Sequence, residues 1–218
     1  SRDWSTQGDA VASNIYDLVE ADGSIWMLYM QVSDREKFTF VMEVYRLRND
    51  VCEKVELPKM PEQMRYPDSM AVSADGTVLL KEYDPGVRAY ESESGAERFF
   101  ADSIDGGFAV WGDMLLGVSV QNRAVERYDL QTGALAGSME MDSLTMEDAI
   151  ATDGTSVFLA NHGGIYRAAL GGQVWERLVD GGLTSLRMPT NYIMDLAVQD
   201  GALYVLTKSG SEYKLLRY

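Results

Sequence analysis

Short runs of alternating apolar and polar residues recur along the chain, and each run follows an aspartate–glycine pair. There are five such pairs: Asp22-Gly23, Asp75-Gly76, Gly112-Asp113, Asp153-Gly154 and Asp200-Gly201. Their aspartates are separated by 53, 38, 40 and 47 residues. Glycine tolerates the positive φ angles of tight hairpin turns, and helical periodicity is nowhere sustained. The pattern therefore predicts β-hairpins that repeat every 40–50 residues or so.

Further strands are predicted on both sides of each hairpin. A short apolar strand precedes each turn, in "IYDLVE", "SMAVS", "GFAVW", "DAIAT" and "MDLAVQ". A third strand follows in every repeat, at residues 44–47, 87–90, 125–128, 165–168 and 212–215. An outer strand comes after it in four repeats, in "CEKVEL", "ERFFA", "ALAGSM" and "QVWERL". Each repeat is thus a small antiparallel sheet of three or four strands.

A sheet of this size cannot bury both faces alone, so similar sheets must stack against one another. We predict an all-β fold, a β-propeller with five blades of three to four antiparallel strands. The blades are expected at residues 14–57, 67–101, 106–141, 147–179 and 192–218, as one domain over residues 1–218. Alternating large side chains, including Trp26, Tyr29, Phe158 and Trp175, are expected to fill the gaps between blades.

The last repeat ends on its third strand, and the N-terminal residues can supply the missing outer one. Residues 2–7, which include Trp4, resemble the outer strand "QVWERL". We predict that they close the ring by pairing alongside Glu212–Arg217, which would remove an exposed sheet edge. The alternative is that the chain is a fragment of a larger ring.

The charge of the chain excludes some classes of partner. With 19 Lys and Arg against 34 Asp and Glu, the net charge is −15, and no basic run is present. Nucleic acid and anionic lipid surfaces are therefore not expected partners. Cys52 is the only cysteine, so neither an intrachain disulfide nor a cysteine-based zinc site can form. No apolar run approaches 18 residues, and we expect a monomer without direct membrane insertion.

Two segments carry a family resemblance. "MAVSADGTVLLKEYDPGVRAYESESGAE" and "VERYDLQTGAL" resemble the repeats of tryptophan–aspartate, NHL-type and quinoprotein-type propellers. Residues 136–138, Ala-Gly-Ser, stand where quinoprotein repeats carry their docking tryptophan, so we expect no quinone and no other cofactor. The chain also resembles propeller regions of Gram-positive extracellular solute-binding lipoproteins. That likeness implies an exported accessory domain of an extracellular or cell-surface bacterial protein. Because the sequence opens on "SRDWSTQGDA", with neither a starting methionine nor a signal peptide, we expect that a leader was removed or that the domain was cut from a longer protein.

One column of the predicted inner strands contains carboxylates. Five residues before each turn aspartate the column has Asp17, Met70, Phe108, Asp148 and Asp195. Three carboxylates around one channel could hold a cation or perform acid–base catalysis. Five-bladed propeller glycosidases place acids on inner strands, so a glycoside hydrolase using Asp17, Asp148 and Asp195 is one hypothesis. The other is that these carboxylates bond backbone amides of adjacent blades.

Other chemically suggestive residues have simpler interpretations. His162 lies in the turn "NHGG" and is the only histidine, which excludes a multi-histidine metal site. No nucleophile-elbow pattern accompanies it. The "DGG" runs at 105–107 and 180–182 have neither the helix nor the lysine of a phosphate-binding loop. We interpret all three as turns and predict no metal site.

The connectors that lead into the inner strands are better candidates for binding. Residues 57–70 and 181–194 are long, and each carries an Arg, a Met, a Pro and a Tyr, whereas the connector "DSLTMEDA" is shorter. In a propeller these loops lie on the face where the channel opens. The candidate ligand-binding residues are Arg65, Tyr66, Asp68, Arg187, Met188, Asn191 and Tyr192.

The sequence therefore favours a non-catalytic module that binds a small molecule, a peptide or a neighbouring domain on the connector face. A propeller glycoside hydrolase is the alternative, and a purely structural spacer is a third hypothesis.

Overall fold

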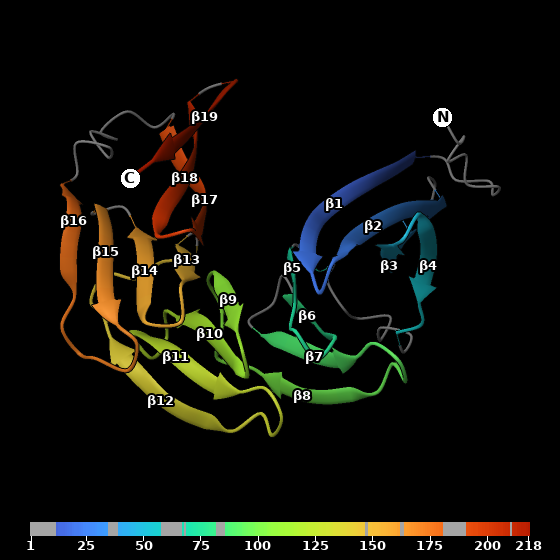
Figure 1. The fold of residues 1–218 in the computed structure, drawn as a ribbon, viewed down its shortest axis with the longest axis horizontal. Helices are drawn as coiled ribbons and strands as arrows, with labels where there is room; N and C mark the ends of the chain where they lie inside the picture. Colours follow the sequence, from blue (N-terminus) through green and yellow to red (C-terminus); the bar gives the residue numbers. More distant parts are fainter. Residues whose placement is uncertain are drawn as a thin grey trace. The chain divides into compact units, whose positions relative to one another are not determined.

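The computed structural model describes residues 12–34, 39–57, 67, 69–81, 86–146, 148–161, 164–180, 191–209 and 211–218. Within these ranges the chain forms 19 strands in five antiparallel sheets and no helix (Figure 1). The predicted all-β fold is confirmed, and it is that of a five-bladed β-propeller. No helix long and apolar enough to cross a membrane occurs in the described part of the chain.

Two compact units divide the chain, Ser1–Phe99 and Phe100–Tyr218. The first unit carries two sheets. The first sheet has the order β1 (Ala12–Ala21), β2 (Ser24–Asp34), β3 (Thr39–Arg48) and β4 (Val51–Val55). The second sheet has the order β5 (Ser69–Val72), β6 (Thr77–Lys81), β7 (Val87–Glu91) and β8 (Glu97–Ala101), whose last two residues begin the second unit.

The second unit carries the other three sheets. The third sheet consists of β9 (Phe108–Trp111), β10 (Met114–Ser119), β11 (Ala124–Asp129) and β12 (Leu135–Glu140). The fourth consists of β13 (Ala149–Thr152), β14 (Ser156–Asn161), β15 (Gly164–Ala169) and β16 (Glu176–Asp180). The fifth consists of β17 (Asn191–Gln199), β18 (Ala202–Ser209) and β19 (Glu212–Arg217). Strands follow one another as neighbours in every sheet, as predicted.

The acid–glycine pairs are turns between the first and second strands of each sheet, as the sequence predicted. Asp22 and Gly23 have φ angles of 50° and 63°, and Asp200 and Gly201 have 51° and 74°. Two consecutive positive φ angles define the type I′ turn, whose twist matches that of the flanking strands. These pairs therefore serve to form the hairpin turns and do not mark a ligand site.

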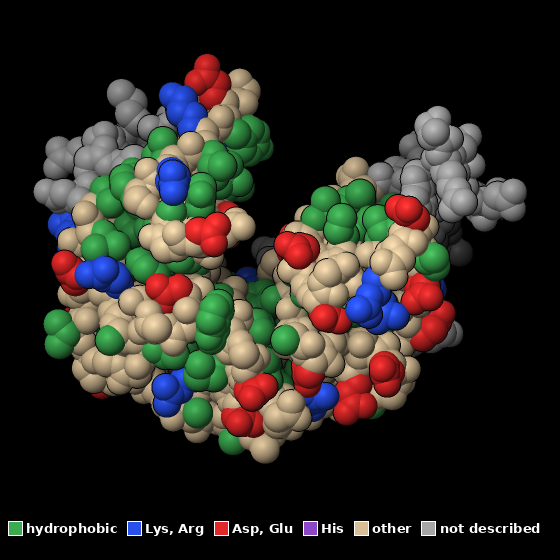
Figure 2. Space-filling view, in the orientation of Figure 1, with side chains coloured by type: hydrophobic (Ala, Val, Ile, Leu, Met, Phe, Trp, Pro, Cys, Tyr) green, Lys and Arg blue, Asp and Glu red, His purple; other side chains and the backbone are tan. Residues whose placement is uncertain are grey.

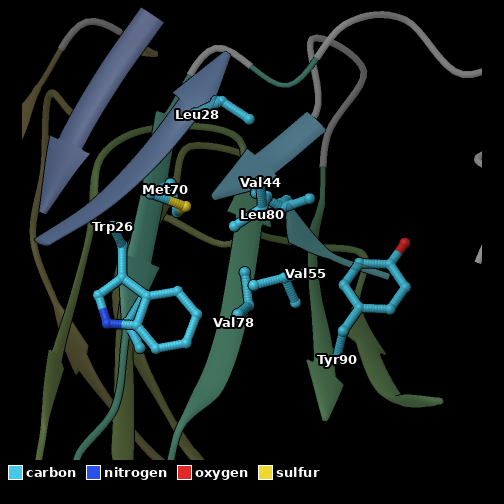
Figure 3. Close-up of a cluster of buried hydrophobic side chains, with 9 residues drawn as sticks. Trp26, Leu28, Val44, Val55, Met70, Val78, Leu80 and Tyr90 are labelled. Carbon is cyan, nitrogen blue, oxygen red and sulfur yellow. The ribbon is translucent and has the colours of Figure 1, made fainter. Parts of the chain in front are cut away.

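The core of the first unit lies between its two sheets. Trp26, Leu28 and Val44 of the first sheet pack with Met70 and other side chains of the second, as Figure 3 shows. Trp26 is therefore inter-sheet core, as predicted. Tyr29 lies beside the core, half-buried, with its ring edge-on to that of Tyr45 at 5.9 Å.

In the second unit, successive side chains of β14 point to opposite faces of the fourth sheet and so belong to two different hydrophobic cores. Val157 and Leu159 pack against the third sheet, whereas Phe158 and Ala160 pack against the fifth. Burying a side chain of this size contributes about 1.5–3 kcal/mol. The fourth sheet is thus held on both faces, which explains why its second strand is apolar at consecutive positions.

Closure by the N-terminal residues stays a prediction. The fifth sheet has three strands in the described ranges, and Trp4 with the rest of residues 1–11 lies outside them. The expectation of one domain over residues 1–218 also stays a prediction.

Candidate functional site

The acidic column was the first candidate site, and Asp17 in it accepts hydrogen bonds from the backbone. A register shift between Ile15 and Asp17 marks a bulge in β1. The Oδ1 atom of Asp17 accepts a hydrogen bond from the amide of Leu18, and Oδ2 accepts one from the amide of Met70, both at 2.8 Å. Met70 is the second residue of β5 in the neighbouring sheet, so Asp17 links the two blades of the first unit.

The other two carboxylates of the column also accept backbone amides. Asp195 follows a matching bulge in β17, and its Oδ1 accepts the amide of Leu196 at 2.8 Å. The side chain of Asp148 belongs to a residue that is only 3% exposed. It accepts hydrogen bonds from the Thr145 amide at 2.8 Å and from the Thr145 hydroxyl at 2.6 Å. Of these bonds, only the one from the Met70 amide to Asp17 comes from an adjacent blade, as the alternative to catalysis predicts; Asp148 and Asp195 accept amides of their own segments.

Replacing Asp148 by alanine is expected to lower the free energy of unfolding of the second unit by about 2 kcal/mol, because the Thr145 amide and hydroxyl lose a charged acceptor in a buried site. Urea unfolding followed by circular dichroism measures this change. Asp195→Ala is the matched control, since Asp195 is exposed, and it should cost clearly less. Equal losses in the two variants would contradict the role assigned to Asp148.

Most of the predicted ligand-binding residues lie outside the described ranges. These are Arg65, Tyr66, Asp68, Arg187 and Met188, and His162 is outside as well. Asn191 and Tyr192 begin β17 opposite Ser209 and Lys208 of β18, but their side chains are not described. Binding by this set stays a prediction.

A pocket is present beside the connector that the sequence reasoning passed over as shorter. Its volume is about 680 Å³, and it is lined by residues 140–145 together with Asn161, Tyr166 and Trp175. The connector leads from β12 of the third sheet into β13 of the fourth. Because Ala149 pairs with Ala160, the end of the connector and Asn161 lie at the same end of the fourth sheet. Pockets of this size are typical of small-molecule sites.

Side chains before β16 hold one wall of the pocket against the outer edge of β12. The indole Nε1 of Trp175 donates to the carbonyl of Glu140 at 2.8 Å. The Gln173 side chain donates to the carbonyl of Ser138 at 2.8 Å and accepts the amide of Glu140 at 3.2 Å. These bonds join the third and fourth sheets and fix the indole of Trp175 at the wall.

The connector itself is anchored at both ends. The amide of Met141 donates to the carbonyl of Arg123 at 2.9 Å, and Leu144 is buried in the core between the third and fourth sheets. Thr145 is held by Asp148. Hydrogen bonds and core packing therefore position both ends of the connector beside the pocket, which suits a binding site.

Charge and aromatic surface meet in this pocket. Glu140 and Asp142 lie at its exposed rim, and its lining in the described part of the chain contains neither Lys nor Arg. Tyr166 pairs with Arg177 of β16, next to a register shift in which Leu178 is the extra residue of β16. The guanidinium of Arg177 lies 5.9 Å from the centre of the Tyr166 ring. Elsewhere, Asp and Glu are spread over both units and interspersed with Lys and Arg (Figure 2).

A second polar cluster, around Glu126 in the third sheet, is buried away from the pocket. The Glu126 carboxylate accepts hydrogen bonds from the hydroxyl of Ser103, from the Tyr128 hydroxyl at 2.8 Å and from the Asn122 amide group at 2.7 Å. Burial raises the pKa of Tyr128 to about 12. The hydrogen bond with Ser103 lowers this pKa, whereas the Glu126 carboxylate raises it further. Glu126 is 3% exposed, so the cluster stabilises the sheet. No group of three or more metal-ligating side chains occurs among the described residues.

Comparisons with known proteins identify the fold and no family. No protein-family model matches the chain, and no curated protein matches it. Among solved structures, the computationally designed protein Ika4 matches with a TM-score of 0.55 and 14% identity, over 75% of this chain and 96% of that one. A streptogramin B lyase matches with a TM-score of 0.56 and 12% identity, over 91% of this chain and 78% of the lyase. At such identities the likeness shows the propeller fold alone.

Proposed function

We propose that this protein is a non-catalytic ligand-binding propeller module and that its ligand binds in the pocket beside connector 141–148. The observation that carries the proposal is the pocket itself, about 680 Å³ in volume and lined by Trp175, Tyr166 and polar connector residues. Aromatic and apolar walls with a few polar groups are the usual composition of a small-molecule site. The connector face is also where the sequence predicted binding.

The glycoside hydrolase alternative has less support. A hydrolase needs two carboxyls facing one open pocket at a separation of about 5–10 Å, with both available to substrate or water. Asp17, Asp148 and Asp195 accept backbone amides, and Asp148 is buried. None of the three lines the pocket described above. Export from a bacterial cell stays a prediction from the sequence.

Filling the pocket is expected to abolish ligand binding without loss of fold. Asp142→Trp places an indole at the exposed rim, and Asp113→Trp makes the same exchange at an exposed turn away from the pocket. A mixture of small amines, carboxylates, sugars and dipeptides is screened by saturation-transfer NMR against each variant. At least one component should bind the wild type and Asp113→Trp, and the signal should fall at least about tenfold with Asp142→Trp.

The same screen examines the connectors predicted from the sequence. The variant R65A/Y66A/R187A/Y192A should also lose binding if the ligand spans those loops. Binding that survives Asp142→Trp, or a mixture in which no component binds, would contradict the proposed function.

A further inference from the structure

We propose that the pocket beside connector 141–148 takes an organic cation, an ammonium or guanidinium group carried on an apolar stem. The inference rests on the proposed function and names the ligand class for the same site. Its basis is the distribution of charge, aromatic rings and apolar side chains over the lining.

Charge is the first argument. Glu140 and Asp142 are exposed acidic residues of the lining, and neither pairs with a Lys or Arg side chain among the residues that the structure describes. The lining residues include two acidic residues and no Lys or Arg, and the nearby Arg177 guanidinium lies over the Tyr166 ring, so an anionic ligand would meet mostly like charge. The net charge of −15 attracts cations to the whole surface as well. A cationic head group is therefore favoured.

The aromatic side chains are the second argument. The quadrupole of an indole or phenol ring attracts a cation within about 6 Å of its centre, and Trp does so best. The Arg177 guanidinium already lies over the Tyr166 ring, 5.9 Å from its centre, so Trp175 is the aromatic wall residue that we assign to a ligand cation. The Trp175 N–H is occupied by the Glu140 carbonyl. A ligand thus meets the indole of Trp175 through its π surface or ring edge and not through that donor.

Apolar side chains define the rest of the ligand. Met141 and Leu144 line the pocket together with Glu140 and Asp142. A bare inorganic cation would gain nothing from them, whereas an alkyl stem buries apolar surface against them and the flexible Met141 thioether adapts to its shape. Alkylamines and the side chains of lysine and arginine share this chemistry.

Calorimetric titration of the whole chain with matched probes tests the proposal. Hexylamine and hexan-1-ol differ in the charged head, as do acetyl-Gly-Lys-Gly-amide and its norleucine counterpart. We expect each charged probe to bind about tenfold more tightly than its neutral partner at low salt, and this preference to shrink as ionic strength rises. Tighter binding of the lysine peptide indicates a peptide ligand, and tighter binding of hexylamine indicates a small amine; either result supports the proposal.

The decisive variant removes the two rim charges. E140Q/D142N should reduce the preference for hexylamine over hexan-1-ol to about twofold or less and leave binding of hexan-1-ol unchanged. E93Q/D113N removes the same charge at exposed positions outside the pocket and should keep the preference. Equal affinity for charged and neutral probes, or a preference that survives E140Q/D142N, overturns the cation proposal. The proposed function is judged separately, by the mixed screen: it falls if no component binds in a manner sensitive to Asp142→Trp, whatever the charge preference.

Discussion

Gly95→Ala is expected to lower the free energy of unfolding of the first unit by about 3 kcal/mol, through a clash with backbone and a strained turn. Gly95 ends the turn between β7 and β8 with φ +68°. A Cβ atom there would lie 2.2 Å from the carbonyl oxygen of Glu56, which follows β4 of the neighbouring sheet. Because that oxygen belongs to the main chain, no side-chain rotation relieves the contact. Urea unfolding, with hydrogen exchange of the β4 and β7–β8 peptides, measures the loss.

Gly23→Ala is the matched control for this prediction. Gly23 has φ +63° in the same unit, and nothing lies within 4 Å of the position its Cβ would take. Its replacement should therefore cost only the strain of the left-handed backbone, about 1 kcal/mol. If the two variants lose the same stability, Gly95 matters for its turn alone and the close approach of the two sheets has no energetic weight.

Glu126→Ala is expected to lower the free energy of unfolding of the second unit by about 4 kcal/mol, since a hydrogen bond to a buried charge contributes about 1.5–3 kcal/mol. The carboxylate accepts bonds from Ser103, Tyr128 and Asn122, and the alanine leaves their donors without it. The Ser103 and Tyr128 hydroxyls already contact each other at 2.6 Å, which recovers part of the loss.

Two further variants serve as controls for the Glu126→Ala prediction. Glu126→Gln preserves the shape and one acceptor oxygen and should cost about 1–2 kcal/mol. Glu140→Ala removes an exposed glutamate of the adjacent strand and should stay within about 0.5 kcal/mol of the wild type. A loss below about 1 kcal/mol in Glu126→Ala would contradict the prediction. It would mean that the hydrogen bonds of Glu126 only offset the cost of burying its charge, as in some other buried ionic groups.

The strands and turns could be predicted because their signals are local. An Asp-Gly pair such as Asp22-Gly23 specifies its turn through the φ angles that its own residues tolerate. The alternation of Val157 to Ala160 shows a strand buried on both faces without reference to any partner. The gap-free alignment of the third strands likewise indicated one repeated sheet, and β7, β11, β15 and β19 confirm it.

The sequence predicted where the residues of the acidic column lie on their strands but not what their carboxylates bind. Alignment correctly put Asp17 and Asp195 at equivalent positions of β1 and β17, and both follow a bulge. Whether a carboxylate faces a ligand or a backbone amide depends on where the next strand begins. For Asp17 that is the amide of Met70, 53 residues further along the chain.

The pocket was missed for the same reason. Its two sides meet through the bond from Trp175 to Glu140, residues that are 35 positions apart. Tyr166 pairs with Arg177 beside a register shift that leaves Leu178 as the extra residue of β16, and the sequence has no signal for that shift.

By itself, then, the sequence determined the repeat, its turns and the five-bladed architecture, because backbone preference and side-chain alternation act within a few residues. Tertiary structure alone decided which carboxylates accept hydrogen bonds from backbone amides, at which glycine a side chain would clash, and which connector borders a pocket. Those outcomes depend on how closely neighbouring sheets approach, and the packing of buried side chains between them sets that distance.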